Sequence, residues 1–256
     1  MKLVVFASGS GGNCALLSDG NTRLLIDAGI SMKRIRDALA AQGLAFSDLS
    51  GVLITHEHSD HIAALPMLLK YTALPFYAPR TVGHALCRTM VDFEEHWQPI
   101  TPLEPFSVGE LCVTAFPTPH DTDESVGYRF EHDSAFAFCT DTGCVTETML
   151  SQLSGCRSVV IEANHDTDML LSGPYPYPLK RRILSERGHL SNADCASLAC
   201  RLASGGTETV VLAHLSRENN RPARAMETVR AALDQSGYSR VALHVAPVLG
   251  ALALEL

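Results

Sequence analysis

Short apolar runs alternate along the chain with polar segments that contain glycine, and a helical pattern follows several of them. Runs typical of buried strands cover residues 2–7, 14–17, 23–29, 51–54, 74–77, 110–116, 125–130, 134–138, 157–161, 209–213 and 241–245. Patterns typical of helices cover residues 32–42, 62–69, 80–90, 193–203 and 222–236. Repeated strand–loop–helix units of this kind predict a mixed sheet with helices packed outside it.

Residues with known end preferences mark two of the helices. Ser31 precedes the pattern at 32–42 as an N-cap, and Gly43 follows it at the position where a left-handed residue ends a helix. Pro222 suits the first position of the last helix, because proline has no backbone N–H to leave without a partner there. The helix expected at 62–69 contains a proline, Pro66.

Size and composition suit a soluble globular protein with a large core. The chain has 256 residues, 46% hydrophobic and 19% charged, and no linker rich in proline, glycine or serine divides it. We therefore predict one domain over residues 1–256. No apolar run approaches the ~20 residues that span a bilayer, and the apolar start of the chain is too short for a signal peptide. We expect a cytoplasmic protein without a membrane partner.

Charge and cysteine content narrow the picture further. A formal net charge of −8, from 28 acids and 20 bases, argues against a general polyanion-binding surface but allows a local basic patch. The eight cysteines include no Cys-x-x-Cys pair, so we interpret them as free thiols in a reducing compartment. A redox-sensitive role for Cys139 or Cys144, which flank a candidate ligand, is the alternative.

Three histidines and an aspartate crowd into one seven-residue stretch, Thr55-His56-Glu57-His58-Ser59-Asp60-His61. His56 and His58 lie two apart on an extended segment, so they point the same way and can share one metal ion. Asp60 and His61, just past the turn, can face a second position close by. Because imidazole and carboxylate are the usual protein ligands of zinc-like cations, the stretch predicts a divalent-metal site.

Three other segments carry candidate chemistry. His120 follows a strand and is held by Pro117 and Pro119, which suits a third ligand for the first metal. In the loop 8–13, backbone amides beside three glycines can approach an anion, or the loop can simply join two strands. Four basic residues within 180–187 can follow a nucleic-acid backbone or form a solvated helix face; they are Lys180, Arg181, Arg182 and Arg187.

The His-x-His-x-Asp-His array resembles the signature of the metallo-β-lactamase superfamily. The resemblance implies an α/β fold, an αββα four-layer sandwich of two mixed sheets flanked by helices, with one or two metal ions at the sheet edge. It also implies further roles: His120 and His214 as ligands, Asp141 as the carboxylate that bridges both metals, and Asp27 as a partner that orients a metal-site histidine. A turn acid is the alternative for Asp27 and for Asp141.

Segments outside the ligands resemble one branch more closely, the YycJ/WalJ-type bacterial metallo-hydrolases, whose known members are nucleases acting on DNA from the 5′ side. The order of Glu162, then His189, then His214 is also similar to tRNase Z. The segments that carry the branch resemblance are 7–13, 55–61, 162–166, 180–184, 188–192 and 212–216. The resemblance thus spans nearly the whole chain.

The hypothesis is a metal-dependent phosphodiesterase, a 5′ to 3′ exonuclease on double-stranded DNA, in which two cations hold a hydroxide and clamp the phosphate. Asp60, His189 and Glu162 are the predicted catalytic residues; Glu162 orients His189, which contacts the phosphate. The metals expected are zinc or manganese, with iron also admissible, and DNA is favoured over RNA as partner. The predicted metal ligands are His56, His58, Asp60, His61, His120, Asp141 and His214, and the predicted substrate contacts are Ser8, Ser10, Asn13, Lys180, Arg181 and His189.

Two other functions stay open from the sequence. One is hydrolysis of a small phosphodiester or a thioester, because this fold hosts several chemistries. The other is a regulatory module that keeps the fold without turnover, although no position of the ligand set is missing.

Overall fold

The computed structural model describes residues 1–248 and 250–256. The chain forms two mixed sheets of seven strands each, with the orders β14-β1-β2-β3-β4-β5-β6 and β13-β12-β11-β10-β9-β8-β7. The described residues fall into two compact units: unit 1 holds residues 1–115, 122–126 and 247–255, and unit 2 holds residues 116–121, 127–246 and 256. The prediction of one domain over the whole chain is not tested by this division.

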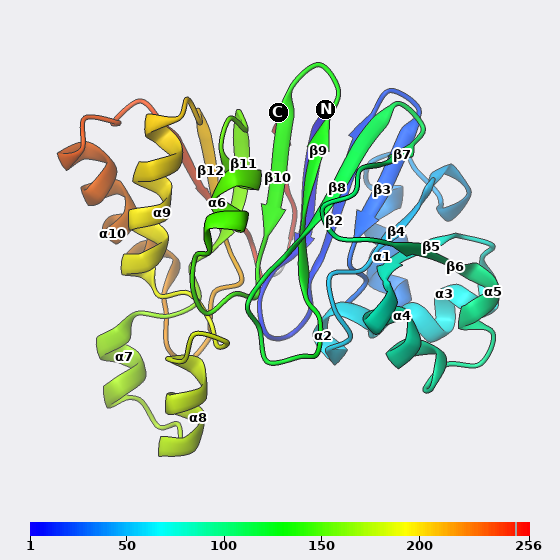
Figure 1. Cartoon of the computed structure of the whole chain (residues 1–256), viewed down its shortest axis with the longest axis horizontal. Helices are drawn as coiled ribbons and strands as arrows, with labels where there is room; N and C mark the ends of the chain where they lie inside the picture. Colours follow the sequence, from blue (N-terminus) through cyan, green and yellow to red (C-terminus); the bar gives the residue numbers. More distant parts are fainter. Residues whose placement is uncertain (249) are drawn as a thin grey trace. The chain divides into compact units, whose positions relative to one another are not determined.

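Unit 1 is built on the first sheet (Figure 1). Its strands are β1 (Lys2–Ala7), β2 (Cys14–Asp19), β3 (Thr22–Ile26), β4 (Gly51–Leu53), β5 (Phe76–Pro79), β6 (Trp97–Ile100) and β14 (Leu252–Glu255). β14, β1, β2 and β3 pair antiparallel, whereas β3 to β6 pair parallel. β14 was not predicted, because its strand character depends on pairing with β1 from the other end of the chain.

Helices cover one face of the first sheet. They are α1 (Met32–Ala40), the short η1 (Phe46–Asp48), α2 (Ser59–Ile62), α3 (Leu65–Tyr71), α4 (Arg80–Cys87) and α5 (Phe93–His96). Fully buried side chains of α1 and α3, such as Leu39 and Leu68, pack in one core with Val52 and Phe76 of the strands. Burial of such aliphatic side chains contributes roughly 1.5–3 kcal/mol each.

The parallel part of the second sheet forms the centre of unit 2. The remaining strands are β7 (Phe106–Val108), β8 (Leu111–Pro117), β9 (Val126–Glu131), β10 (Ala135–Cys139), β11 (Ser158–Glu162), β12 (Thr209–Ala213) and β13 (Ala242–Val245). β10 to β13 pair parallel, so their carboxyl ends meet at one edge. That edge is where ligands bind in open α/β sheets, and Asp141, Glu162 and His214 lie there.

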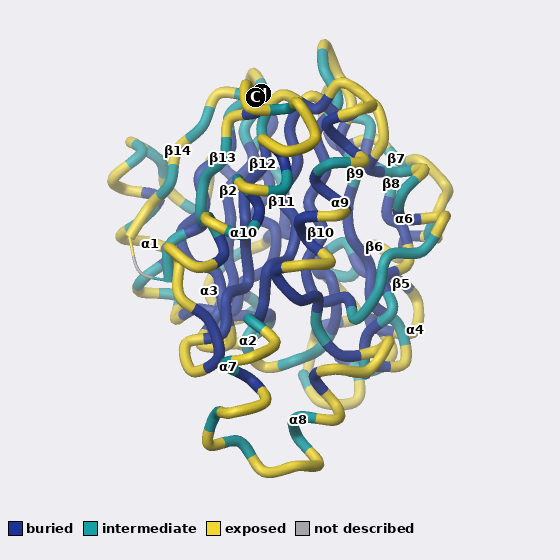
Figure 2. The backbone as a smooth tube through the Cα atoms, turned by 90° about the vertical axis from the view of Figure 1, so that its left-hand side faces the viewer, coloured by how far each residue is buried: buried dark blue, intermediate teal, exposed yellow. Residues whose placement is uncertain are grey.

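The helices of unit 2 divide into a packed set and an exposed pair. α6 (Glu147–Leu153), α9 (Asn192–Ser204) and α10 (Pro222–Gln235) lie beside β10, β11 and β12 and share a core with them (Figure 1). α7 (Thr167–Ser172) and α8 (Tyr177–Ile183) are largely exposed, as is the segment between them (Figure 2).

The predicted fold class is confirmed in its two mixed sheets and flanking helices. One predicted element is wrong in detail: the helix expected at 62–69 is split, since α2 ends at Ile62 and α3 starts at Leu65. Pro66 lies in the first turn of α3, where its missing N–H costs nothing, instead of inside a helix. Among the described residues, no helix combines the length and the apolar character that crossing a bilayer demands.

Candidate metal-binding centre

The histidine-rich stretch of unit 1 leaves β4 and turns into α2, which buries two of its three imidazoles. His56 is 0% and His61 is 1% exposed. The ring of His56 lies 4.1 Å from that of His61 and 4.6 Å from that of His58, centroid to centroid. Buried polar rings packed this closely lose their hydrogen bonds to water. A bound cation compensates this loss by accepting the lone pairs of the ring nitrogens.

Asp27 fixes the orientation of this cluster. Its Oδ2 accepts a hydrogen bond from Nδ1 of His61 at 2.7 Å, and both its oxygens accept from the hydroxyl of Thr55. Thr55 Oγ1 then lies 3.0 Å from Nδ1 of His56, placed to accept its proton. Since Asp27 is 1% exposed, water does not compete for these bonds. Asp27 therefore holds the His61 ring in place, and its role beside a metal-bound histidine stays a prediction.

Backbone hydrogen bonds tie two other loops to the histidine stretch. The amide of Asn13 donates to the carbonyl of Asp60 at 2.8 Å, that of Gly29 to Asn13 at 2.8 Å, and that of Ala28 to His61 at 2.8 Å. A Cβ on Gly29 would lie 1.6 Å from the carbonyl oxygen of Asp60. Only glycine permits this approach.

The glycine-rich loop places its three candidate substrate residues differently. The Asn13 amide group lies 3.3 Å from Oδ2 of Asp60 and 3.0 Å from Nε2 of His61. Ser8 is 4% exposed, whereas Ser10 lies at the surface. Asn13 thus contacts metal-ligand candidates directly, and the loop braces the histidine stretch as well as joining β1 to β2.

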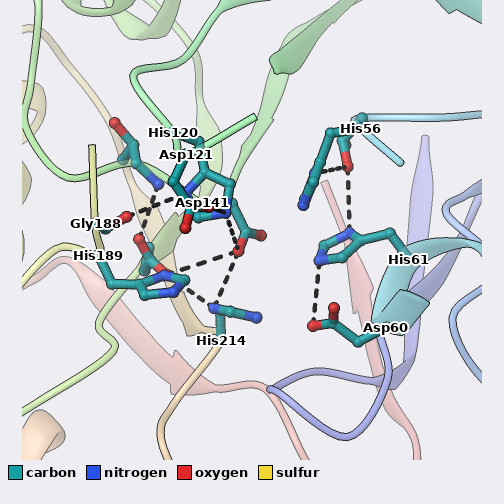
Figure 3. A network of polar contacts seen from close by, with 12 residues as sticks. His56, Asp60, His61, His120, Asp121, Asp141, Gly188, His189 and His214 are labelled. Carbon is teal, nitrogen blue, oxygen red and sulfur yellow. Dashed lines mark hydrogen bonds and ion pairs between the residues drawn. The ribbon is translucent and has the colours of Figure 1, made fainter. Parts of the chain in front are cut away.

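Glu162 organises the polar cluster of unit 2. It ends β11, is 0% exposed and accepts four hydrogen bonds. Oε1 accepts from Nδ1 of His189 and Nδ1 of His214, each at 2.8 Å (Figure 3). Oε2 accepts from the backbone amides of Thr142 at 3.0 Å and Leu190 at 3.1 Å. One carboxylate therefore holds two imidazoles and two loops.

Asp141 completes this cluster. It is 2% exposed, and its Oδ1 lies 3.5 Å from Nδ1 of His214 and 3.8 Å from Nδ1 of His189. The four residues Asp141, Glu162, His189 and His214 can each offer one ligand atom, with all four atoms within 4.8 Å of one another.

His120 is held by the segment that follows α8. Its Nδ1 lies 3.1 Å from the carbonyl of Gly188 (Figure 3). Its own carbonyl accepts a hydrogen bond from Nε of Arg187 at 2.7 Å. The neighbouring Asp121 forms an ion pair with Arg182. The segment 182–188 thus fixes both residues of the loop through two arginine side chains and one backbone carbonyl, and the two prolines are only part of its rigidity.

Three residues at the ends of the strands have a left-handed backbone. Asp27, Asp141 and His214 have φ values of 58°, 57° and 55°, and they account for three of the five described residues other than glycine with positive φ. This conformation costs of order 1–3 kcal/mol at each residue and clusters at functional sites. Here it turns a side chain back over the end of its strand.

The donor set fits divalent cations. Nδ1 of five imidazoles faces an oxygen acceptor, which leaves the lone pair on Nε2, the usual arrangement of metal-bound histidine. The five are His56, His61, His120, His189 and His214. Nitrogen and carboxylate donors without thiolate suit zinc, manganese or iron alike.

Burial and charge shift three pKa values in unit 2. Burial alone would raise the pKa of Glu162, but the charge and hydrogen bond of His189 hold it well below its usual range. Burial would lower the pKa of His189, yet Glu162 raises it above the ordinary value. For His120, burial prevails over the attraction of Asp141 and lowers the pKa.

Fewer basic side chains of segment 180–187 are free to contact a substrate than its composition predicts. Nζ of Lys180 donates to the carbonyls of Leu171 at 2.6 Å and Gly173 at 2.8 Å, and Arg182 and Arg187 hold the His120 loop. The side chain of Arg181 has no hydrogen bond or ion pair with any other residue that the structure describes, and it lies at the surface. Of the two basic residues predicted as substrate contacts, Arg181 is therefore the one with an unengaged charge.

The thiols support the non-redox interpretation. All eight cysteines are free, and burial raises the pKa of Cys139, which is 1% exposed. Burial also raises the pKa of Cys144. A thiolate, the reactive form, is disfavoured at both positions.

Sequence reasoning missed several supporting residues. The side-chain amide of Asn164 donates to the carbonyl of His214 at 2.9 Å, and that of Asn220 donates to the carbonyls of Ala163 and Asn164. Thr55 connects two histidines to Asp27. Asparagines and threonines are common in loops, so nothing local distinguishes these residues; their roles come from partners 28 to 57 residues away in the sequence.

Residues 22–215 match the family model described as a beta-lactamase superfamily domain. The chain belongs to the metallo-β-lactamase superfamily. Within it, the chain is 36% identical over 241 residues to "Exodeoxyribonuclease YycJ" of Bacillus anthracis, covering 91% of this chain and 89% of that protein. It is 38% identical over 225 residues to "Exodeoxyribonuclease WalJ" of Streptococcus pneumoniae, covering 86% and 83%. The resemblance noted from the sequence is confirmed.

A solved structure shares the metallo-β-lactamase fold along its whole length. The fold protein YhfI from Bacillus subtilis superposes with a TM-score of 0.75 at 16% identity, covering 99% of each chain. At this identity the likeness concerns the fold alone. Membership of the superfamily agrees with divalent metal ions as cofactors.

Proposed function

We propose that this chain is a metal-dependent phosphodiesterase that degrades double-stranded DNA from its ends in the 5′ to 3′ direction. The observation that carries the metal chemistry is the set of imidazoles whose Nδ1 is already bound, in unit 1 by Asp27 and Thr55 and in unit 2 by Glu162 and Gly188. The substrate class is supported by two relatives that are named exodeoxyribonucleases and match most of the chain.

The proposed ligands follow the motif order of the superfamily. His56, His58 and His120 would hold the first metal, Asp60, His61 and His214 would hold the second, and Asp141 would serve both. Bound divalent cations supply Lewis acidity, which activates water and neutralises charge on the phosphate. The cations are zinc or manganese, with iron as the further candidate.

The two histidines that are bound to Glu162 have different proposed roles, metal binding and substrate binding. The side chain of His214 is 2% exposed, whereas that of His189 is 21% exposed. His214 therefore suits a ligand and His189 suits a substrate contact, donating from Nε2 to a phosphate oxygen. Glu162 holds the His189 ring in place for this bond, and effects of such positioning are typically 10²–10⁴-fold for a general acid or base.

Polar residues of unit 1 complete the proposal. Asp60 accepts from Asn13 and is placed to orient the attacking water. Ser8, Ser10 and Asn13 are the proposed contacts of the glycine-rich loop with a substrate phosphate. The cytoplasmic location expected from the sequence suits a DNA substrate and belongs to this proposal.

The test is cleavage of an end-labelled DNA duplex and of its RNA counterpart, with Zn²⁺ or Mn²⁺ added. We expect stepwise shortening of DNA by the wild type, loss of cleavage in Asp60→Ala, and unchanged cleavage in Asp133→Ala, a control acid exposed on the β9–β10 hairpin. Metal content is measured for each variant. Failure to cleave either polymer by metal-loaded wild type would overturn the nuclease proposal and favour a small phosphodiester or thioester, to be sought with chromogenic substrates.

A further inference from the structure

The exposed helical pair of unit 2 carries an unusual concentration of apolar surface. We call residues 167–184, which comprise α7, α8 and their connection, the helical hairpin. Seven large hydrophobic side chains are exposed among the described residues, and three of them lie in the hairpin: Leu171 at 55%, Tyr177 at 72% and Leu184 at 45%. Surface apolar residues gathered in this way mark interaction sites more often than isolated ones do.

Two of these residues share one face of α8 with a cation. Tyr177, Arg181 and Leu184 follow the i, i+4, i+7 spacing that brings side chains onto one side of a helix. Arg181 is exposed, and its guanidinium group has no hydrogen bond or ion pair within the described part of the chain. The face therefore presents an aromatic ring, a guanidinium group and an aliphatic side chain in a row.

The hairpin is rigid and is fastened to the candidate centre of unit 2. Nζ of Lys180 in α8 donates hydrogen bonds to the carbonyls of Leu171 and Gly173 at the end of α7, which links the two helices. Arg182 pairs with Asp121, and the amide of His189 donates to the carbonyl of Ile183 at 3.0 Å. Hydrogen bonds thus join α8 to the residues that carry His189 and Asp121, and a surface that is ordered in advance loses little conformational entropy on binding.

We propose that this face of α8 binds an unpaired DNA strand adjacent to the cleaved end, with a base stacked on Tyr177 and a phosphate paired with Arg181. This rests on the proposed nuclease function and deepens it by assigning where the substrate continues. Stacking on an exposed aromatic ring combined with a basic group is the way proteins hold single strands without reading sequence. The positive charge stands out on a chain of net charge −8, which favours an anionic occupant.

The length of the helix sets the footprint. Seven residues at ~1.5 Å each make α8 roughly 10 Å long, which is enough to contact a few nucleotides of an unpaired strand. We therefore expect substrates with an unpaired extension of three nucleotides or more to bind better than blunt duplexes, and no sequence preference within that extension.

The test compares Tyr177→Ala and Arg181→Ala with matched controls, Tyr71→Ala and Arg240→Ala, which change an exposed tyrosine and an exposed arginine in other parts of the chain. With Mn²⁺ and an overhang duplex, we expect each hairpin variant to raise KM about tenfold with kcat nearly unchanged. The controls and Tyr177→Phe, which keeps the ring, stay at the wild-type value. Hydrolysis of bis(p-nitrophenyl) phosphate stays unchanged in the two controls, Tyr71→Ala and Arg240→Ala.

Direct binding separates this inference from the proposed function. Fluorescence anisotropy of a labelled single-stranded oligonucleotide is measured in the Asp60→Ala background, where cleavage is expected to be absent. Weaker binding after Tyr177→Ala, with a salt dependence reduced by about one ion after Arg181→Ala, supports the inference even if no nuclease activity is found. Active wild type with hairpin variants that bind and cleave like the controls overturns it, as does absence of oligonucleotide binding by intact protein.

Discussion

Two buried carboxylates perform the same task in the two units, but with very different numbers of partners. Asp27 in unit 1 serves Thr55 and His61, two residues of one short stretch. Glu162 in unit 2 serves four residues from three segments: Thr142, the neighbouring pair His189 and Leu190, and His214. Asp27 thus orients residues of one short stretch of the sequence, whereas Glu162 joins segments that lie far apart in the sequence.

Because of this difference, loss of Asp27 and loss of Glu162 should disturb different amounts of structure. The stretch around His56 keeps its spacing without Asp27, because β4, α2 and the backbone bonds of Ala28 and Asn13 also hold it. Loss of the Glu162 charge removes the common acceptor of two imidazoles and leaves buried donors facing each other. Each buried donor left without an acceptor costs about 1–3 kcal/mol. Loss of Glu162 therefore carries this cost for several donors at once.

The largest effect is expected for Glu162→Gln. The amide nitrogen cannot accept, so at least two of the four donors lose their acceptor. We expect activity to fall about 100-fold or more, with lower metal content and a lower Tm. Initial rates, metal analysis and thermal unfolding measure this. Activity within a few-fold of wild type would contradict the central role given to Glu162.

Asp27→Asn sharpens the comparison from the other side. The new amide nitrogen faces either the backbone amide of Thr55 or Nδ1 of His61, so at most one imidazole loses its acceptor. We expect a decrease of about tenfold in activity, clearly smaller than that of Glu162→Gln in the same assay. Equal losses in the two variants would show that the number of partners does not decide the effect.

Arg187→Gln probes the support of the His120 loop. The variant removes the bond from Nε of Arg187 to the His120 carbonyl, while the bond from Nδ1 of His120 to Gly188 remains. We expect about a threefold lower activity on DNA and on a small phosphodiester alike. Arg240→Gln, at an exposed arginine elsewhere in unit 2, serves as control. A loss confined to DNA would instead identify Arg187 as a substrate contact.

The smallest effect concerns a histidine in unit 2 outside the Glu162 network. His165 is 1% exposed, neither ring nitrogen has a hydrogen-bond partner among the described residues, and burial lowers its pKa. Because a buried polar group without a partner destabilises the fold, His165→Leu should leave the free energy of unfolding unchanged or raise it by up to about 1 kcal/mol. Denaturant unfolding measures this, and a clear loss of stability would show that the imidazole has a structural role.

Much of the ligand chemistry was predictable because it is local. His56, His58, Asp60 and His61 lie within six residues, and the spacing alone indicates a metal site. Strand ends were also readable, since an apolar run followed by an acid or a histidine marks Asp27, Asp141, Glu162 and His214. The ends of α1 and α10 followed from Ser31 and Pro222, whose end preferences act within one turn.

Long-range partners were not predictable. The sequence indicated a basic segment at 180–187, but only the tertiary structure decided that Lys180, Arg182 and Arg187 are engaged by carbonyls and by Asp121, while Arg181 is not. It also decided that Asn13 contacts His61 and that β14 pairs with β1. Spacing and end preferences act over a few residues and are written in the sequence, whereas the choice of a hydrogen-bond partner depends on which distant segments folding brings together.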